Sequence, residues 1–111
     1  MVENLEEYMC TYMKSLANHL TGCLLAAWKS KDGYLSLLDE RLGSTIESVD
    51  LKLCGLLASA GLFREEEKLT MDGNNRYRLF YLTDAGKEIA EQAEAEGYNG
   101  TIPKSVEIPN P

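Results

Sequence analysis

Apolar residues recur at helical spacing along the first quarter of the chain. From residue 5 to residue 28 they return at steps of three and four, a stripe sustained over about seven turns. Asn4 with Glu7 three positions later matches a capping box, and Gly33 is typical of the residues that follow a helix end. The pattern predicts a long first helix over residues 5–30.

The stripe is longer than a small domain covers by itself, and exposed apolar surface of that extent usually marks an interface. We therefore predict a homodimer that packs through the first half of this helix and part of the last. The alternative is that the stripe is simply core. The expected interface residues are Leu5, Tyr8, Met9, Tyr12, Met13, Leu16, Ile89 and Ala93.

The next segment begins with Tyr34 and Leu35, which fit a very short strand. Ser36 is a candidate N-cap for a second helix, with Asp39 in its first turn. Gly43 ends this helix after barely two turns. The buried side of this helix is expected to consist of Leu37, Leu38 and Leu42.

A third helix is predicted from Ser44 to Ala60, because Ser44 and Glu47 form a Ser-x-x-Glu capping box. Its apolar stripe comprises Ile46, Val49, Leu53, Leu56, Leu57 and Ala60. Its outward face comprises Thr45, Glu47, Ser48, Leu51, Lys52 and Gly55. Two helices joined by a short turn that contains glycine form a helix-turn-helix, here over residues 36–60.

From residue 62 the period changes to two, which predicts a β-hairpin over residues 62–82. The turn falls at Asp72-Gly73-Asn74-Asn75, where positive φ angles are easily adopted. Thr83 is the expected N-cap of a last helix over 83–97, with Ile89, Ala90 and Ala93 on its apolar side. The proline-containing segment 98–111 is expected to be an extended, mobile tail, with docking through Ile102, Val106 and Ile108 as the alternative.

Composition fits one cytoplasmic domain over residues 1–97, since 111 residues suffice for a core and no apolar run is long enough to span a membrane. The predicted helices and the hairpin together make the fold class α+β and mainly α. The three cysteines, Cys10, Cys23 and Cys54, suit buried reduced thiols. The net charge of −7 weakens the case for nucleic-acid binding, although a locally basic face can still contact DNA.

Three local strings resemble winged helix-turn-helix regulators of the small MarR, PadR or ArsR type. They are Leu38-Asp39-Glu40-Arg41-Leu42-Gly43 in the second helix, Leu56 to Phe63 at the end of the third, and Tyr81-Leu82-Thr83-Asp84-Ala85-Gly86-Lys87 at the start of the last. In such a protein the hairpin is the wing. The resemblance implies a dimeric transcriptional regulator that binds duplex DNA with its third helix in the major groove and its wing beside it.

Carried onto this chain, the resemblance places groove contacts on the third helix and further contacts on the wing. The implied DNA-binding residues are Ser44, Thr45, Ser48, Lys52, Lys68, Asn74, Asn75, Arg76 and Arg78. Lys52 stands alone as a cation on the third helix, beside the apolar Leu51. A winged-helix module that binds another protein, without sequence-specific DNA binding, is therefore the alternative function.

Other chemistry has weaker support. His19 and Cys23 are four residues apart and share a helical face, which is a weak metal-site pattern. Cysteine on an apolar stripe is usually core, so we expect neither a metal nor another cofactor. A single histidine and the lack of a phosphate loop or nucleophile motif argue against an enzyme. A ligand cleft lined by Tyr8, Tyr12, Met13 and Trp28 is a further alternative.

Overall fold

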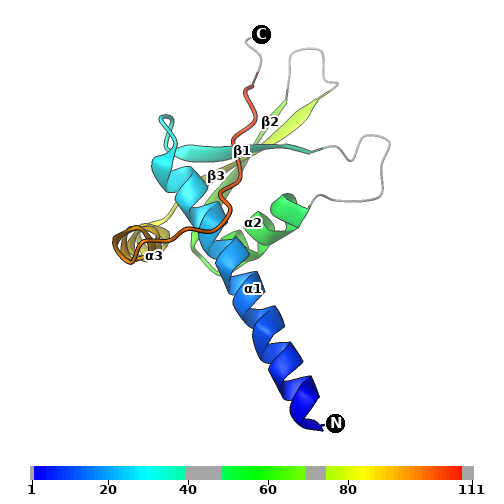
Figure 1. The fold of residues 1–111 in the computed structure, drawn as a ribbon. Helices are drawn as coiled ribbons and strands as arrows, with labels where there is room; N and C mark the ends of the chain where they lie inside the picture. The colour runs from blue at the N-terminus through cyan, green and yellow to red at the C-terminus, as the bar shows by residue number, and fades with distance from the viewer. Residues whose placement is uncertain (1, 40–48, 70–74, 109–111) are drawn as a thin grey trace.

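A computed structural model describes residues 2–39, 49–69 and 75–108, with the side chains of residues 13–39, 49–69 and 75–108. These residues form three helices and one three-stranded antiparallel sheet (Figure 1). In chain order the elements are α1 (Val2–Lys29), β1 (Tyr34–Asp39), α2 (Val49–Ser59), β2 (Phe63–Leu69), β3 (Arg76–Leu82) and α3 (Asp84–Ala95). The protein is thus a small α+β domain.

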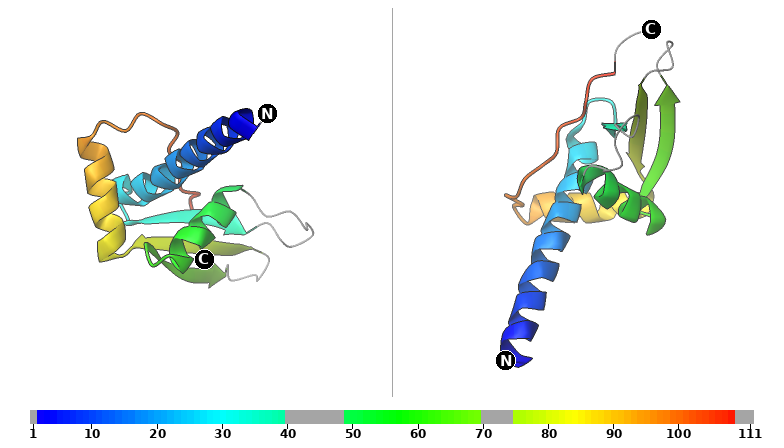
Figure 2. Two further views of the ribbon diagram at one scale, coloured as in Figure 1. Left: turned by 90° about the horizontal axis from the view of Figure 1, so that it is seen from below. Right: turned by 90° about the vertical axis from the view of Figure 1, so that its right-hand side faces the viewer.

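The sheet has the strand order β1-β3-β2, so β3 lies at its centre. The register pairs Leu35 with Phe80 and Phe63 with Leu82, which places these apolar side chains on one face. Phe80 and Leu35 are fully buried there. Helices α1 and α2 pack on this inner face, α3 lies at the end of the sheet and packs mainly against α1, and the hairpin β2–β3 extends beyond them (Figures 1 and 2).

The predicted second helix is wrong where the structure describes it, because Ser36 to Asp39 belong to β1. A helix of two turns is marginal by itself, whereas β3 offers these residues a ladder of backbone hydrogen bonds. Every second residue of a strand faces the same way, so Leu35, Leu37 and Asp39 all lie on the inner face. All three are buried. Residues 40–48, with the rest of that helix and its turn, lie outside the described residues.

Helix α2 is rotated relative to the predicted third helix. Its buried residues are Leu51, Leu53, Cys54 and Leu57. Leu51, expected to face outward, is therefore core, while Val49 and Leu56 from the expected apolar stripe are exposed. The helix is apolar around much of its circumference, so periodicity alone leaves its orientation open. Packing against α1 and the sheet decides which side is buried.

A glycine corner joins α2 to the sheet. Gly61 has φ +81° and follows the last turn of α2, while Leu62 N–H donates to the Leu57 carbonyl at 2.9 Å. With the bond from Gly61 N–H to Ala58, this is a Schellman end. Because the chain turns sharply at Gly61, β2 starts directly beside the end of α2.

The start of α3 is tied to the same corner. Thr83 is the N-cap, as predicted, and its hydroxyl oxygen accepts from Gly86 N–H at 3.2 Å. The Thr83 hydroxyl also donates to the Gly61 carbonyl at 2.7 Å, and Thr83 N–H donates to Leu62. The Leu-Thr-Asp-Ala-Gly string therefore locks α3 against the junction of α2 and β2.

Helix α1 has two different halves. Near its C-terminal end Cys23, Leu24 and Leu25 are almost fully buried, packed between the sheet, α2 and α3. Its N-terminal half projects away from the body, as Figure 2 shows. On that half Met13 is 63% exposed. The side chains of the expected interface residues Leu5, Tyr8, Met9 and Tyr12 lie outside the described set.

The C-terminal segment 98–108 is extended and lies against α1 and β1. It crosses α1 at Gly22, where the Tyr98 hydroxyl donates to the Asn18 carbonyl at 2.8 Å. It then reaches the free edge of β1 (Figure 1). Tyr98 and Ile102 pack against the core on the way.

Gly22 is where the tail approaches α1 most closely, and α1 remains helical through it. A Cβ at this position would collide with the Thr101 carbonyl oxygen and lie 2.8 Å from the Tyr98 hydroxyl. Gly22→Ala should therefore release the tail while leaving α1 intact, because alanine favours the helix. We expect trypsin to cleave after Lys104 several times faster than in the unaltered chain, with an unchanged helical circular-dichroism signal. Equal cleavage rates would contradict this close packing.

Candidate nucleic-acid interface

The residues implied in DNA binding fall on α2 and on the hairpin β2–β3. Lys52, Lys68, Asn75, Arg76 and Arg78 are described by the structure. Ser44, Thr45, Ser48 and Asn74 lie outside the described residues. The described part of the expected interface therefore consists of residues on α2 and on the hairpin.

Helix α2 and the hairpin enclose a cleft of about 460 Å³. The helix contributes Leu51, Lys52, Gly55, Leu56 and Ser59, and the strands contribute Glu65 and Arg78. Lys52 is exposed at this cleft, so the fold does bring the helix cation and a hairpin cation to one concave surface.

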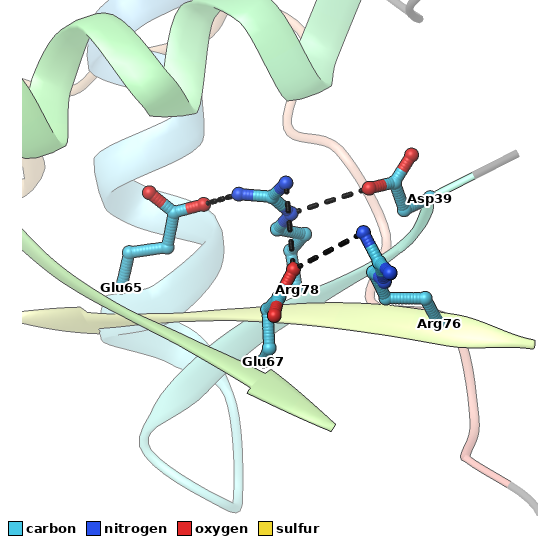
Figure 3. Close-up of polar contacts among 5 residues, drawn as sticks. All are labelled: Asp39, Glu65, Glu67, Arg76 and Arg78. Carbon is cyan, nitrogen blue, oxygen red and sulfur yellow. Dashed lines mark hydrogen bonds and ion pairs between the residues drawn. The ribbon is translucent and has the colours of Figure 1, made fainter. Parts of the chain in front are cut away.

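Arg78 lies at the centre of an ion-pair cluster on the inner face of the sheet (Figure 3). Its Nε donates to Asp39 Oδ2 at 3.3 Å, and its Nη1 donates to Glu65. The Arg78 side chain is 20% exposed and that of Asp39 only 1%. The register places Asp39 and Glu65 diagonally across from Arg78 on the same face of the sheet, so three strands supply the cluster.

The acidic neighbours of Arg78 set its protonation behaviour. Partial burial lowers the pKa of Arg78, but the hydrogen bond and charge of Glu65 and the charge of Asp39 outweigh that effect and raise it. The guanidinium is therefore charged at every physiological pH. Its charge is already compensated inside the protein, which reduces what it can offer a phosphate.

Arg76 shares this arrangement at the open end of the cluster. Its Nη1 lies 3.5 Å from Glu67 Oε1, and Glu67 also lies 3.6 Å from Arg78 Nη2 (Figure 3). The Arg76 side chain is 46% exposed, so solvent weakens this pair. Arg76 is therefore more available to a ligand than Arg78.

Lys68 points to the other face of the sheet, since its register partner is Tyr77 rather than Arg76 or Arg78. On this outer face Arg64 pairs with Glu66 and stands over the Tyr81 ring at 4.4 Å. Burial, followed by the charge of Glu66, raises the pKa of Tyr81. The hairpin cations are thus divided between two faces, with Arg76 and Arg78 on the side of α2.

The acidic half of the Arg78 cluster was not expected from the sequence. The sequence pattern places Asp39 in a helix, away from the predicted hairpin that contains Glu65 and Glu67. Their spacing of two along β2 does carry a signal, because residues two apart share a strand face. Without the register of the hairpin, however, that face cannot be matched to Arg78.

Those residues of the alternative ligand cleft and metal site that the structure describes lie apart from one another. Trp28 packs against the core whereas Met13 lies on the projecting half of α1, about 22 Å away at 1.5 Å per residue. His19 is exposed, and its Nδ1–H donates to the Ser15 carbonyl at 2.8 Å. Cys23 instead points into the core. Within the described ranges no three His, Cys, Asp or Glu side chains gather as a metal site.

Two thiols meet between α1 and α2. Cys23 and Cys54 are both free and buried. The hydrogen bond that Cys54 donates lowers the pKa of Cys23, and the same bond together with burial raises the pKa of Cys54. Both behave as core side chains that hold the two helices together. Cys10 lies outside the described side chains.

A groove between α1 and α3 contains two residues of the expected dimer surface, Ile89 and Ala93. With Thr21 and Tyr98 they are among the residues that line a cleft of about 270 Å³ there. Ile89 is exposed. Leu16, also expected at the dimer surface, is half-buried on α1 outside this cleft.

Comparisons with protein-family models, curated proteins and solved structures found no match to this chain. Among the described residues, none of the helices combines the length and the apolar character that a membrane span requires. The functional assignment therefore rests on the geometry of the chain.

Proposed function

We propose that this protein is a winged-helix regulator that binds duplex DNA through α2 and the β2–β3 hairpin. The observation that carries the proposal is the arrangement of these elements. Helix α2 leads through the Gly61 corner into a hairpin, and the sheet order β1-β3-β2 places α2 and the hairpin on one concave side. This is the layout that a groove-reading helix with an adjacent wing requires.

The charges support DNA binding at this surface only in part. Lys52 and Arg76 are exposed on the concave side, while Arg78 serves the internal cluster. Few phosphate contacts imply a modest dependence of affinity on salt. A dimer doubles the number of contacts. The projecting half of α1 supports dimerisation, since an unpartnered helix of this length is a natural subunit contact.

A second candidate function is a winged-helix module that binds another protein on the same surface. It is favoured by apolar side chains that remain exposed on α2 and β2, of which Leu56 lines the cleft. Val49, Leu56 and Leu69 are exposed by 69%, 57% and 58%. Exposed aliphatic residues beside compensated charges are typical of protein contacts rather than phosphate contacts.

Fluorescence anisotropy with the DNA upstream of the protein's own gene tests the proposal. We expect binding at about 50 mM salt, with two chains per duplex, and a loss of affinity at about 200 mM salt. Lys52→Ala should weaken binding by roughly three- to tenfold, since it removes one phosphate or base contact. Lys104→Ala, on the tail, is the charge-matched control. An absence of binding at the lower salt would exclude the regulator and favour the protein-binding module.

A further inference from the structure

The free edge of β1 carries contacts that the proposed function does not use. In the sheet order β1-β3-β2, β1 is an edge strand, and its outward backbone groups are available to a further chain. The C-terminal tail lies there, as Figure 1 shows. Val106 N–H donates to the Ser36 carbonyl at 2.9 Å, and the Ser36 hydroxyl donates to the Val106 carbonyl.

A serine of the tail extends this contact, because its hydroxyl group bonds to the backbone of β1 where a neighbouring strand's backbone would. The Ser105 hydroxyl oxygen accepts from Ser36 N–H at 3.1 Å, and its hydrogen is donated to the Tyr34 carbonyl at 3.4 Å. Ser36 is only 1% exposed, so the tail completes the environment of a buried polar residue. The edge of β1 is thus built to accept an extended segment with a hydroxyl residue at one defined position.

A cleft of about 450 Å³ continues this edge toward the hairpin. Its lining includes Lys68 from β2, Tyr34 from β1 with Asp32 just before it, and Glu107 and Ile108 from the tail. Lys68 is the cation in this lining, and Glu107 is the acidic side chain that the tail brings to it. The site therefore combines a strand edge with a cation that suits an acidic residue of the seated segment.

The two anchors of the tail differ in kind. At Gly22 the tail is wedged against α1, and Tyr98 and Ile102 join the core. At β1 it is held by hydrogen bonds through Ser105 and Val106, and both side chains are exposed. The second anchor is shallow, so it is the one that can exchange.

We propose that the β1 edge is a strand-addition site for an extended peptide of the Ser-Val-Glu-Ile type, and that the protein's own tail is a tethered occupant which a partner protein's segment replaces. Recognition comes from the backbone of β1, from the hydroxyl position opposite Ser36 and from Lys68. The tether keeps the tail at an effective concentration on the order of millimolar, so it competes with any free segment. This site is separate from the concave surface proposed for DNA.

The test uses the full-length chain with Val106→Pro, which removes the N–H that the Ser36 carbonyl accepts. The matched control is Val106→Ala, which keeps that N–H. The probe is a fluorescein-labelled peptide with the sequence of residues 101–108, and its control carries proline in place of Val106. Hydrogen exchange of the Ser36 N–H reports whether the edge has been vacated.

We expect faster exchange of Ser36 N–H in Val106→Pro, and peptide affinity at least about tenfold higher for this variant than for the unaltered chain or Val106→Ala. The proline peptide should not bind. If Val106→Pro lowers the helical signal, Ser105→Ala, which removes the hydroxyl bridge, repeats the comparison. The proposal is overturned by equal binding to all chains, by no binding to a vacated edge at millimolar peptide, or by unchanged exchange in both variants.

Discussion

Replacing Gly86 by alanine should destabilise the protein by roughly 2–3 kcal/mol, although alanine is the better helix former. Gly86 lies in the first turn of α3, directly against Leu62, the residue before β2. A Cβ there would collide with the Leu62 carbonyl oxygen and lie 3.0 Å from Leu82 Cδ2. Since that carbonyl is the acceptor for Thr83 N–H, relief of the collision breaks the corner. Urea unfolding followed by Trp28 fluorescence measures the loss.

Gly55→Ala is the matched control for this prediction. Gly55 lies inside α2, and a Cβ at that position meets no atom within 4 Å. The same substitution should therefore raise stability by about 0.5–1 kcal/mol through helix propensity alone. If both variants gained stability, the packing of α3 on Leu62 would be looser than the structure indicates.

Arg78→Ala should destabilise the protein by roughly 2–3 kcal/mol, because it leaves the carboxylate of Asp39 buried without its guanidinium. This is less than the cost for a fully buried pair, since the Arg78 side chain is 20% exposed and Asp39 has a further interaction. Thermal unfolding at neutral pH measures the effect. Any accompanying loss of DNA binding would then report the fold rather than a DNA contact.

Two further variants isolate the Asp39–Arg78 pair. Arg76→Ala removes an arginine from the same strand face, but its pair with Glu67 is exposed, so we expect a change within about 0.5 kcal/mol. Asp39→Asn in the Arg78→Ala background removes the buried negative charge and should recover part of the stability. If the double variant were no more stable than Arg78→Ala, the loss of stability would come from packing rather than from charge.

Local chemistry explains what the sequence predicted well. Thr83 caps α3 through its own side chain, and the glycines at 33, 61 and 97 adopt positive φ where the chain leaves a helix. These features depend on neighbours within a few residues, which a sequence shows directly. The strands of the hairpin likewise follow from alternation and aromatic content.

The segment Ser36 to Asp39 shows where local chemistry was insufficient. Its capping pattern favours a helix, but its hydrogen-bond partners lie on β3 and on the tail, which are distant in the chain. A two-turn helix gains too little by itself to compete with a ladder of that kind. The strand is therefore a product of the assembled sheet.

The candidate site divides in the same way between sequence and tertiary structure. The sequence by itself determined which residues bear charge, that Thr83 begins α3, and that α2 precedes a hairpin. Only the tertiary structure decided that Leu51 turns inward, that Arg78 serves Asp39 and Glu65, and that the tail covers β1. Those outcomes depend on strand register and helix rotation, because each is set by contacts between segments distant in the chain.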